Sequence, residues 1–132
     1  MTYSNIKYNF MEKELGKLFV KYKVFFAFNK DQFNEGMKKN NIPANEPLSE
    51  IIGGGIMPRK NKADFRKDFD NLYSKMVAKI KKLDPDLVIR YELANYESWY
   101  TRDISSAWQV LKDYGYTKDQ VLEVFNKYQK EL

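Results

Sequence analysis

Apolar side chains recur at steps of three and four residues along most of the chain, which is the spacing of amphipathic helices. The first stripe follows Ser4, a candidate N-cap, and runs to Tyr22. Gly16 lies inside this stripe, and because glycine weakens a helix by about 1 kcal/mol relative to alanine, we expect it to permit close packing by a neighbouring element. The longest stripe starts at Asn61, a second candidate cap, and continues to Leu83. Both stripes predict long helices.

Capping residues predict two further helices. Asn29 followed by Gln32 resembles a capping box and predicts a helix over residues 30–39. Asp84 and the proline after it predict a helix start, since Asp caps helices and Pro is tolerated at the first helical position. The residues that follow, 87–93, also alternate as a strand would, but the cap favours a helix.

The C-terminal part of the chain predicts a helical hairpin. Residues 98–102 read as a tight connector, and Asp103 caps the helix that follows. Gly115 ends that helix, because glycine is favoured just past a helix C-terminus. Thr117 and Gln120 form a capping box for the last helix.

Two segments predict strands. Residues 24–28 are short, aromatic and nearly all apolar, which favours a strand covered on both faces. Residues 48–57 predict a second strand, bent at the glycine run 53–55 and paired with the first. The predicted fold is α+β: a mostly helical single domain over residues 1–132, with about five helices and a small two- or three-stranded sheet.

The chain contains no cysteine and no histidine. Disulfides, the usual zinc sites, Ser/His and Cys/His nucleophile pairs and the commonest general base are therefore excluded. No segment approaches the roughly 18 apolar residues of a membrane span, and the N-terminus lacks a basic region followed by an apolar one. We therefore expect a soluble cytoplasmic protein with no membrane partner, no cofactor and no enzymatic activity.

Basic residues concentrate in the first part of the chain. Residues 1–83 carry 17 basic and 9 acidic side chains, a net charge of +8, whereas residues 84–132 carry a net charge of −3. A basic front can attract a polyanion, although lysines that merely face water give the same pattern on amphipathic helices. Basic and aromatic residues are interleaved over 21–26 and 99–102, which suits the stacking of single-stranded bases, but most of these rings lie at core spacing. We expect Trp99 and Tyr100, in the connector, to be the most exposed of them.

Carboxylate and amide side chains are dense between Tyr91 and Asp103. The candidates for a divalent-metal or acid–base cluster are Glu92, Asn95, Glu97 and Asp103. On a helix Glu92 and Asn95 share a face but Glu97 is turned away, so joint action requires the helix to end near Tyr96. The alternative is an ordinary helix end whose polar groups satisfy backbone donors.

The glycine run Gly53, Gly54 and Gly55 precedes Arg59 and Lys60. Glycines let backbone approach an anion closely, and the two cations would add charge, so the run is a candidate anion-binding loop. It lacks the Gly-Lys-Ser/Thr ending of a P-loop and the spacing of the dinucleotide fingerprint. The alternative is a turn or bulge that permits close packing.

Two motifs carry a resemblance to known proteins. Residues 25–36, Phe-Phe-Ala-Phe-Asn-Lys-Asp-Gln-Phe-Asn-Glu-Gly, and residues 92–101, Glu-Leu-Ala-Asn-Tyr-Glu-Ser-Trp-Tyr-Thr, together with the glycine run, resemble a group of small uncharacterised proteins from phages and low-GC bacteria. Many of those proteins carry His where Tyr96 stands. The resemblance implies a mobile-element setting and supplies no activity or binding residues.

Missing catalytic machinery beside an aromatic, loop-like segment favours a binding function, since Trp, Tyr and Arg anchor interfaces. We expect a non-enzymatic accessory module that binds a host macromolecule, with a protein as partner. The expected surface is formed by residues 53–60 and 96–102. Its interaction residues are Tyr96, Trp99, Tyr100, Arg102, Arg59 and Lys60. The alternatives are a nucleic-acid-binding protein, an inhibitor of a host nucleic-acid-targeting defence system, and a divalent-metal-dependent enzyme.

Overall fold

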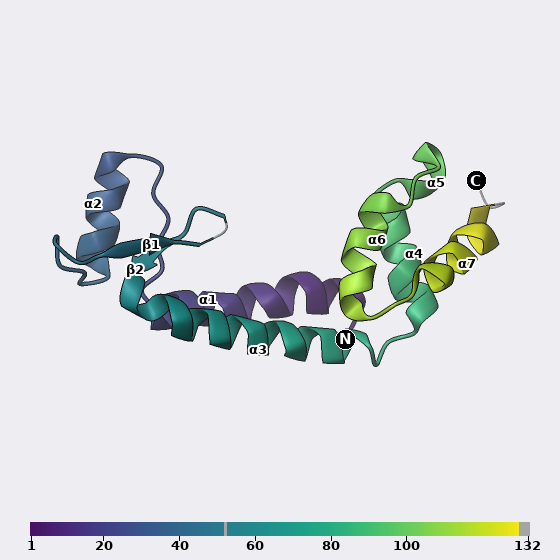
Figure 1. Ribbon diagram of the computed structural model, residues 1–132, viewed down its shortest axis with the longest axis horizontal. Coiled ribbons are helices and arrows are strands. Elements are labelled where there is room, and N and C mark those ends of the chain that lie inside the picture. Colours follow the sequence, from purple (N-terminus) through teal and green to yellow (C-terminus); the bar gives the residue numbers. More distant parts are fainter. Residues whose placement is uncertain (52, 130–132) are drawn as a thin grey trace. The chain divides into compact units, whose positions relative to one another are not determined.

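The computed structural model describes residues 1–51 and 53–129 (Figure 1). Within these residues the fold is α+β, as predicted, and has more helices than the five or so expected. The α-helices are α1 (Met11–Lys21), α2 (Lys30–Lys39), α3 (Lys62–Ile80), α4 (Pro85–Asn95), α5 (Ser98–Thr101), α6 (Ser105–Leu111) and α7 (Lys118–Tyr128), and the strands are β1 (Leu48–Glu50) and β2 (Ile56–Pro58). A π-helical stretch (Asn5–Phe10) precedes α1, and 3-10 turns lie at Arg59–Asn61 and Lys112–Tyr114.

The chain groups into two compact units, and each is described by itself. The hairpin unit is Lys7–Lys75, and the helical unit combines Met1–Ile6 with Met76–Leu132. The single domain expected from the sequence stays a prediction. Over the described ranges, no helix is both long enough and apolar enough to cross a membrane.

The sheet of the hairpin unit is a two-stranded antiparallel hairpin. β1 pairs with β2 in the register Leu48 to Pro58, so the predicted single strand over 48–57 is two short strands joined by a turn. The predicted strand over 24–28 is wrong, because only Phe25 pairs, in one bridge to Ile56. The segment between the end of α1 and the cap of α2 is short, so the chain forms one bridge and then enters α2.

The glycine run makes the turn of this hairpin. Gly53 and Gly54 have φ angles of 98° and 88°, the left-handed region that glycine enters without steric cost. Gly55 is buried instead, and a Cβ there would lie 2.7 Å from Cγ1 of Ile51. The run therefore serves turn geometry and close packing, which is the alternative weighed for it above. Residue 52 of the predicted strand lies outside the described residues.

Aromatic rings hold α1 against α3 in the hairpin unit, where the two helices run side by side (Figure 1). Phe19 of α1 stacks on Phe65 of α3 with ring centroids 6.3 Å apart, and Met57 of β2 is fully buried in the same cluster. At the end of α1, Lys21 forms an ion pair of 2.9 Å with Asp68, and the Tyr22 hydroxyl donates to the same carboxylate. This core is continuous with the hairpin through β2.

Two helix-interior glycines differ in surroundings. A Cβ on Gly16 of α1 would meet nothing within 4 Å, so the expectation of close packing at this residue is wrong. A Cβ on Gly36 of α2 would lie 2.2 Å from the Phe25 ring, so close packing occurs there. Sequence reasoning missed Gly36, because the ring that covers it comes from outside the helix.

Three of the predicted caps are present, at Asn29, Asp84 and Thr117. Asn29 Oδ1 accepts from the Gln32 amide at 2.8 Å, and α2 spans the predicted residues 30–39. Asp84 caps α4, which shows that residues 87–93 are helical. Thr117 and Gln120 form both bonds of the capping box at α7.

Ser4 is not a cap, because it lies inside the first helical stretch, where the Thr2 hydroxyl accepts from the Asn5 amide at 3.1 Å. The side chain of Asn61 donates instead to the Tyr22 carbonyl oxygen at 2.9 Å.

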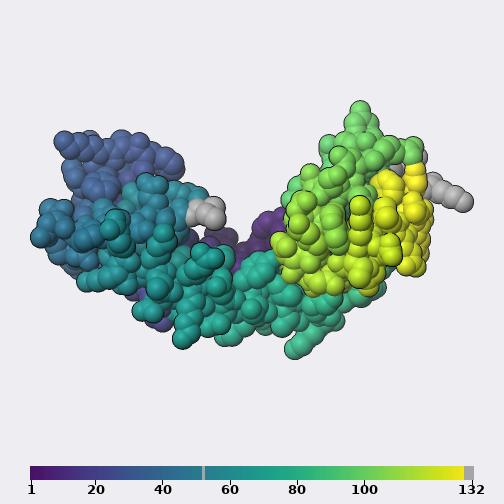
Figure 2. Space-filling view, viewed as in Figure 1, coloured from purple at the N-terminus to yellow at the C-terminus, as the bar shows by residue number. Residues whose placement is uncertain are grey.

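α4 lies at the centre of the helical unit, where it contacts α5, α6 and α7. α6 and α7, green and yellow in Figure 2, lie side by side. The fully buried apolar residues of α4, α6 and α7 are Val88, Ile89, Leu93, Ala107, Leu111 and Val121. The N-terminal segment completes this core, because Tyr3 and Ile6 are also buried in it.

Candidate functional site

The segment predicted as a connector over 98–102 is a single helical turn, α5, bounded by two left-handed residues. Glu97 has φ 53° and ψ 35°, and Arg102 has φ 61° and ψ 28°. A non-glycine residue costs roughly 1–2 kcal/mol in this conformation. Such strain persists where the surroundings over-determine the backbone, and it clusters at functional sites.

Buried and anchored side chains hold α5 in place. Ser98 is fully buried. The Trp99 indole Nε1 donates to the Phe125 carbonyl oxygen of α7 at 2.8 Å, and the indole stacks on the Phe125 ring at 6.0 Å with an interplanar angle of 4°. Trp99 is therefore half-buried and has a structural role. Of the two aromatic residues expected to be exposed, only Tyr100 is, with 88% of its surface accessible.

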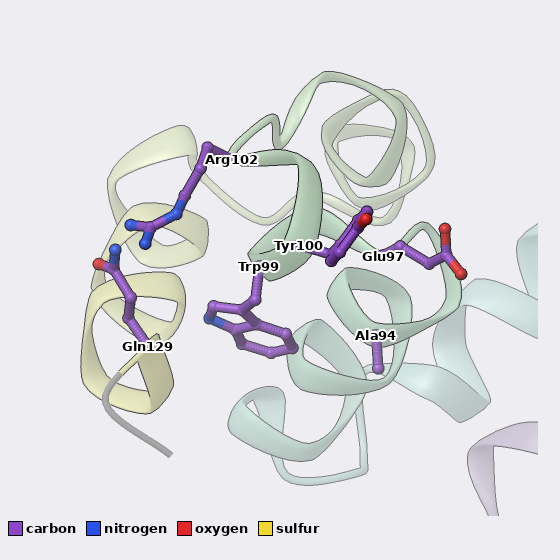
Figure 3. Close-up of a pocket in the computed structure, with 6 residues that line it drawn as sticks. All are labelled: Ala94, Glu97, Trp99, Tyr100, Arg102 and Gln129. Carbon is purple, nitrogen blue, oxygen red and sulfur yellow. The ribbon is translucent and has the colours of Figure 1, made fainter. Parts of the chain in front are cut away.

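A surface hollow of about 620 Å³ lies beside α5 (Figure 3). Figure 3 shows the guanidinium of Arg102 and the amide of Gln129 on one side of the Trp99 indole, with Tyr100 and Glu97 on the other side. Ala94 of α4 completes the lining. The hollow thus offers an aromatic ring, a cation, an amide and a carboxylate within one ligand-sized space.

The remaining predicted interaction residues lie outside this hollow. Tyr96 is partly exposed at the C-terminal end of α4 and is not part of the lining. Arg59 and Lys60 belong to the hairpin unit, where the Arg59 Nη2 donates to the Leu48 carbonyl at 3.4 Å and Lys60 pairs with Glu46 at 3.4 Å. The helical unit therefore brings together three of the six predicted residues: Trp99, Tyr100 and Arg102.

In the candidate anion loop one of the three glycine amides is engaged, and the anion-binding role of the loop stays a prediction. The Gly54 amide donates to the Ile51 carbonyl at 3.1 Å, and the Ile51 amide donates to the Gly55 carbonyl at 2.8 Å. Amides that already bond the backbone are not available to cradle an anion.

The acidic residues between 92 and 103 serve different local roles. Glu92 is fully buried, and its Oε1 accepts from Asn95 Nδ2 at 3.4 Å, as the shared helix face predicts. Glu97 and Asp103 are exposed, and Asp103 Oδ1 accepts from the Ser105 amide at 2.8 Å at the start of α6. Hydrogen bonds from Ser105 hold the pKa of Asp103 below its usual range. Across residues 1–51 and 53–129, no group of three or more acidic residues is arranged to hold a metal ion.

Sequence reasoning missed the partners of Glu92. The Tyr3 hydroxyl donates to Glu92 Oε2 at 2.5 Å and lies 3.2 Å from the Tyr114 hydroxyl. Burial, followed by the hydrogen bond to Glu92, raises the pKa of Tyr3 far above its usual range. The two contacts join residues 89 and 111 positions apart, so no local pattern predicts them.

Comparison with protein families matches residues 7–131 to a family of unknown function. No curated protein and no solved structure matches the chain. The expected membership of an uncharacterised family is confirmed, and no residue role comes with the match.

Proposed function

The chain belongs to DUF7659, a family of unknown function, and we propose that it is a non-enzymatic module that binds a protein partner. The proposed binding site is the hollow beside α5, called the α5 hollow below. The observation that carries this proposal is Tyr100. It is almost fully exposed on a helical turn that the buried Ser98 and the contacts of Trp99 with Phe125 hold in place. Tyrosine side chains on rigid supports are favourable anchors, since they lose little conformational entropy on binding.

The hollow favours a peptide segment that carries a carboxylate next to an apolar side chain. Arg102 has no ion-pair partner among the described residues, so its planar guanidinium is available for a two-bond contact with a carboxylate. The exposed Tyr100 ring and the half-buried Trp99 indole supply the adjoining apolar surface. The carboxylate of Glu97, on the other side of the indole, disfavours a partner with a second acidic group there.

Site-specific photo-crosslinking tests this function. A photoreactive phenylalanine analogue is placed at position 100 and, in a second protein, at position 8, since Tyr8 is also exposed but lies in the hairpin unit. A protein that crosslinks to position 100 and not to position 8 is purified, and its affinity for the parent chain is measured by calorimetry. We expect Tyr100→Ala to weaken binding by about 30-fold or more, as truncation of an anchor does, and Tyr8→Ala to leave it unchanged.

Equal affinity of the Tyr100→Ala variant and the parent protein would refute the proposed site. Trp99→Ala is unsuitable for this test, because it removes the hydrogen bond and the stacking that hold α5 to α7. Arg102→Gln is the better second variant, since it keeps a long polar side chain and removes the charge. We expect it to reduce affinity and to weaken the salt dependence of binding.

We also propose a phage or mobile-element setting, with a component of the host as the partner; inhibition of a nucleic-acid-targeting defence is one form of this role. The support is the resemblance carried by residues 25–36 and 92–101. The genes next to the coding sequence test the setting: phage structural, integrase or anti-defence genes would support it, and housekeeping genes would count against it.

A further inference from the structure

The segment between α1 and α2 exposes two phenylalanine rings. Phe28 is 93% exposed and Phe26 is 45% exposed. Phe28 directly precedes Asn29, the N-cap of α2, where an apolar side chain usually packs on the fourth helical residue. That residue, Phe33, packs against Phe25 instead, with ring centroids 5.9 Å apart. Burial of a phenylalanine ring stabilises a fold, and the exposed ring of Phe28 makes no such contribution.

These rings belong to the more basic of the two units. The hairpin unit contains 14 basic and 9 acidic residues, whereas the helical unit contains 9 of each, so the whole net charge of +5 resides in the hairpin unit. Lys23 and Lys30 flank the two rings in the sequence, both are exposed, and neither has an ion-pair partner among the described residues. Lys23 has a φ of 60°, a left-handed conformation in which glycine is the usual residue after the end of a helix.

The side-chain oxygens of two amides near Phe28 are already engaged. Asn29 Oδ1 accepts from the Gln32 amide, and Gln32 Oε1 accepts from the Phe28 amide, each at 2.8 Å. The side-chain oxygens of both residues are therefore committed to the start of α2. A partner at this surface would meet ring faces and ammonium groups, which carry no sequence preference.

We propose that residues 23–30 bind single-stranded nucleic acid without sequence preference. Phe26 and Phe28 stack on neighbouring bases, and Lys23 and Lys30 contact phosphates. The strand is single because bases within a duplex are not accessible for stacking on side chains. The rings stand on a non-helical segment, two residues apart, rather than on the flat apolar face of a helix that lies in a membrane surface. This inference does not depend on the α5 hollow, which belongs to the helical unit.

Fluorescence anisotropy with a labelled 20-nucleotide oligothymidine at low salt tests the proposal. We expect binding that weakens steeply as salt rises, because phosphate contacts release counterions. We expect Phe28→Ala to weaken binding about 5- to 150-fold, as the loss of one stacked base does. Leu87→Ala is the control in the other unit, because Leu87 is also exposed and does not line the α5 hollow, and it should leave the affinity unchanged. This test and the test of the proposed function fail independently, since they probe different surfaces.

Phe28→Leu separates stacking from general apolar contact, because leucine keeps the apolar character and has no aromatic face. We expect it to weaken oligonucleotide binding nearly as much as Phe28→Ala, and Phe28→Tyr to retain binding. All three variants should melt within a few degrees of the parent protein, since the side chain is exposed. No binding at low salt, full binding by Phe28→Leu, or binding only to anionic phosphatidylserine vesicles would overturn the proposal.

Discussion

Asp68 shows how a half-exposed carboxylate contributes to this fold. It accepts hydrogen bonds from the Tyr22 hydroxyl and the Lys21 ammonium group. Both bonds hold the pKa of Asp68 below its usual range, and the bond from Tyr22 has the larger effect. A carboxylate with a lowered folded-state pKa adds stability above its unfolded pKa of 3.8, and this contribution is lost as the pH falls toward the folded value.

We therefore predict that Asp68→Asn lowers the free energy of unfolding at pH 6 and that the difference from the parent protein shrinks as the pH falls below about 4. Chemical denaturation followed by circular dichroism at pH 6, 5, 4 and 3 measures this difference. Asp70→Asn is the matched control, because Asp70 is exposed on the same helix. A difference that stays constant with pH would contradict the role given to Asp68.

Single residues also show what local sequence cannot supply. The cap at Asn29 and the capping box at Thr117 were predictable, because both partners lie within three residues. Trp99 was placed in a connector and expected to be free, yet its partner Phe125 lies 26 residues away. Tyr3 carried no signal at all, since its contacts to the buried Glu92 depend on the folding of the whole helical unit.

At the scale of elements, α1 and α2 allow one substitution to be compared in two surroundings. Alanine is favoured over glycine by about 1 kcal/mol in a helix interior. We predict that Gly16→Ala raises the free energy of unfolding by about 0.5–1 kcal/mol, because the added methyl group has open space. Gly36→Ala should lower it by about 1–3 kcal/mol, because the methyl group would overlap the buried Phe25 ring.

Urea denaturation of the two variants measures this pair, each serving as the other's control. Stabilisation by both substitutions would show that the Phe25 ring moves aside at little cost. Destabilisation by both would show that α1 is packed closely at Gly16 in solution.

Helices were easier to predict than strands for a physical reason. A helix is stabilised by contacts between residues three and four apart, so its stripe and its caps are both written locally. The strand over 24–28 had a suitable composition, but a strand exists only if a partner runs beside it, and here the pairing stops after Phe25. The composition of residues 48–57 likewise could not tell one bent strand from a hairpin.

At the scale of the whole molecule, the first six residues belong to the helical unit that is otherwise formed by residues 76–132. Tyr3 and Ile6 are buried there, although the family match begins only at residue 7. We predict that deletion of residues 2–6 lowers the free energy of unfolding by at least about 4 kcal/mol, the combined scale of losing two large buried side chains.

Thermal and urea denaturation of the truncated protein measure this loss. Ser4→Ala is the control, because Ser4 is exposed within the same segment and its change should cost less than about 1 kcal/mol. A truncated protein as stable as the parent would show that Tyr3 and Ile6 add nothing to the core in solution.

Tyr3 is synthesised long before its partners Glu92 and Tyr114. The hairpin unit is one continuous stretch, so it can fold while the ribosome is still translating, whereas the N-terminal segment waits for partners that emerge about 90 to 110 residues later. At roughly 5–20 residues per second, that interval lasts from several seconds to about twenty. During this time two large apolar side chains at the N-terminus are open to chaperones and proteases, so chaperone capture in the cell is expected to be concentrated on the nascent chain.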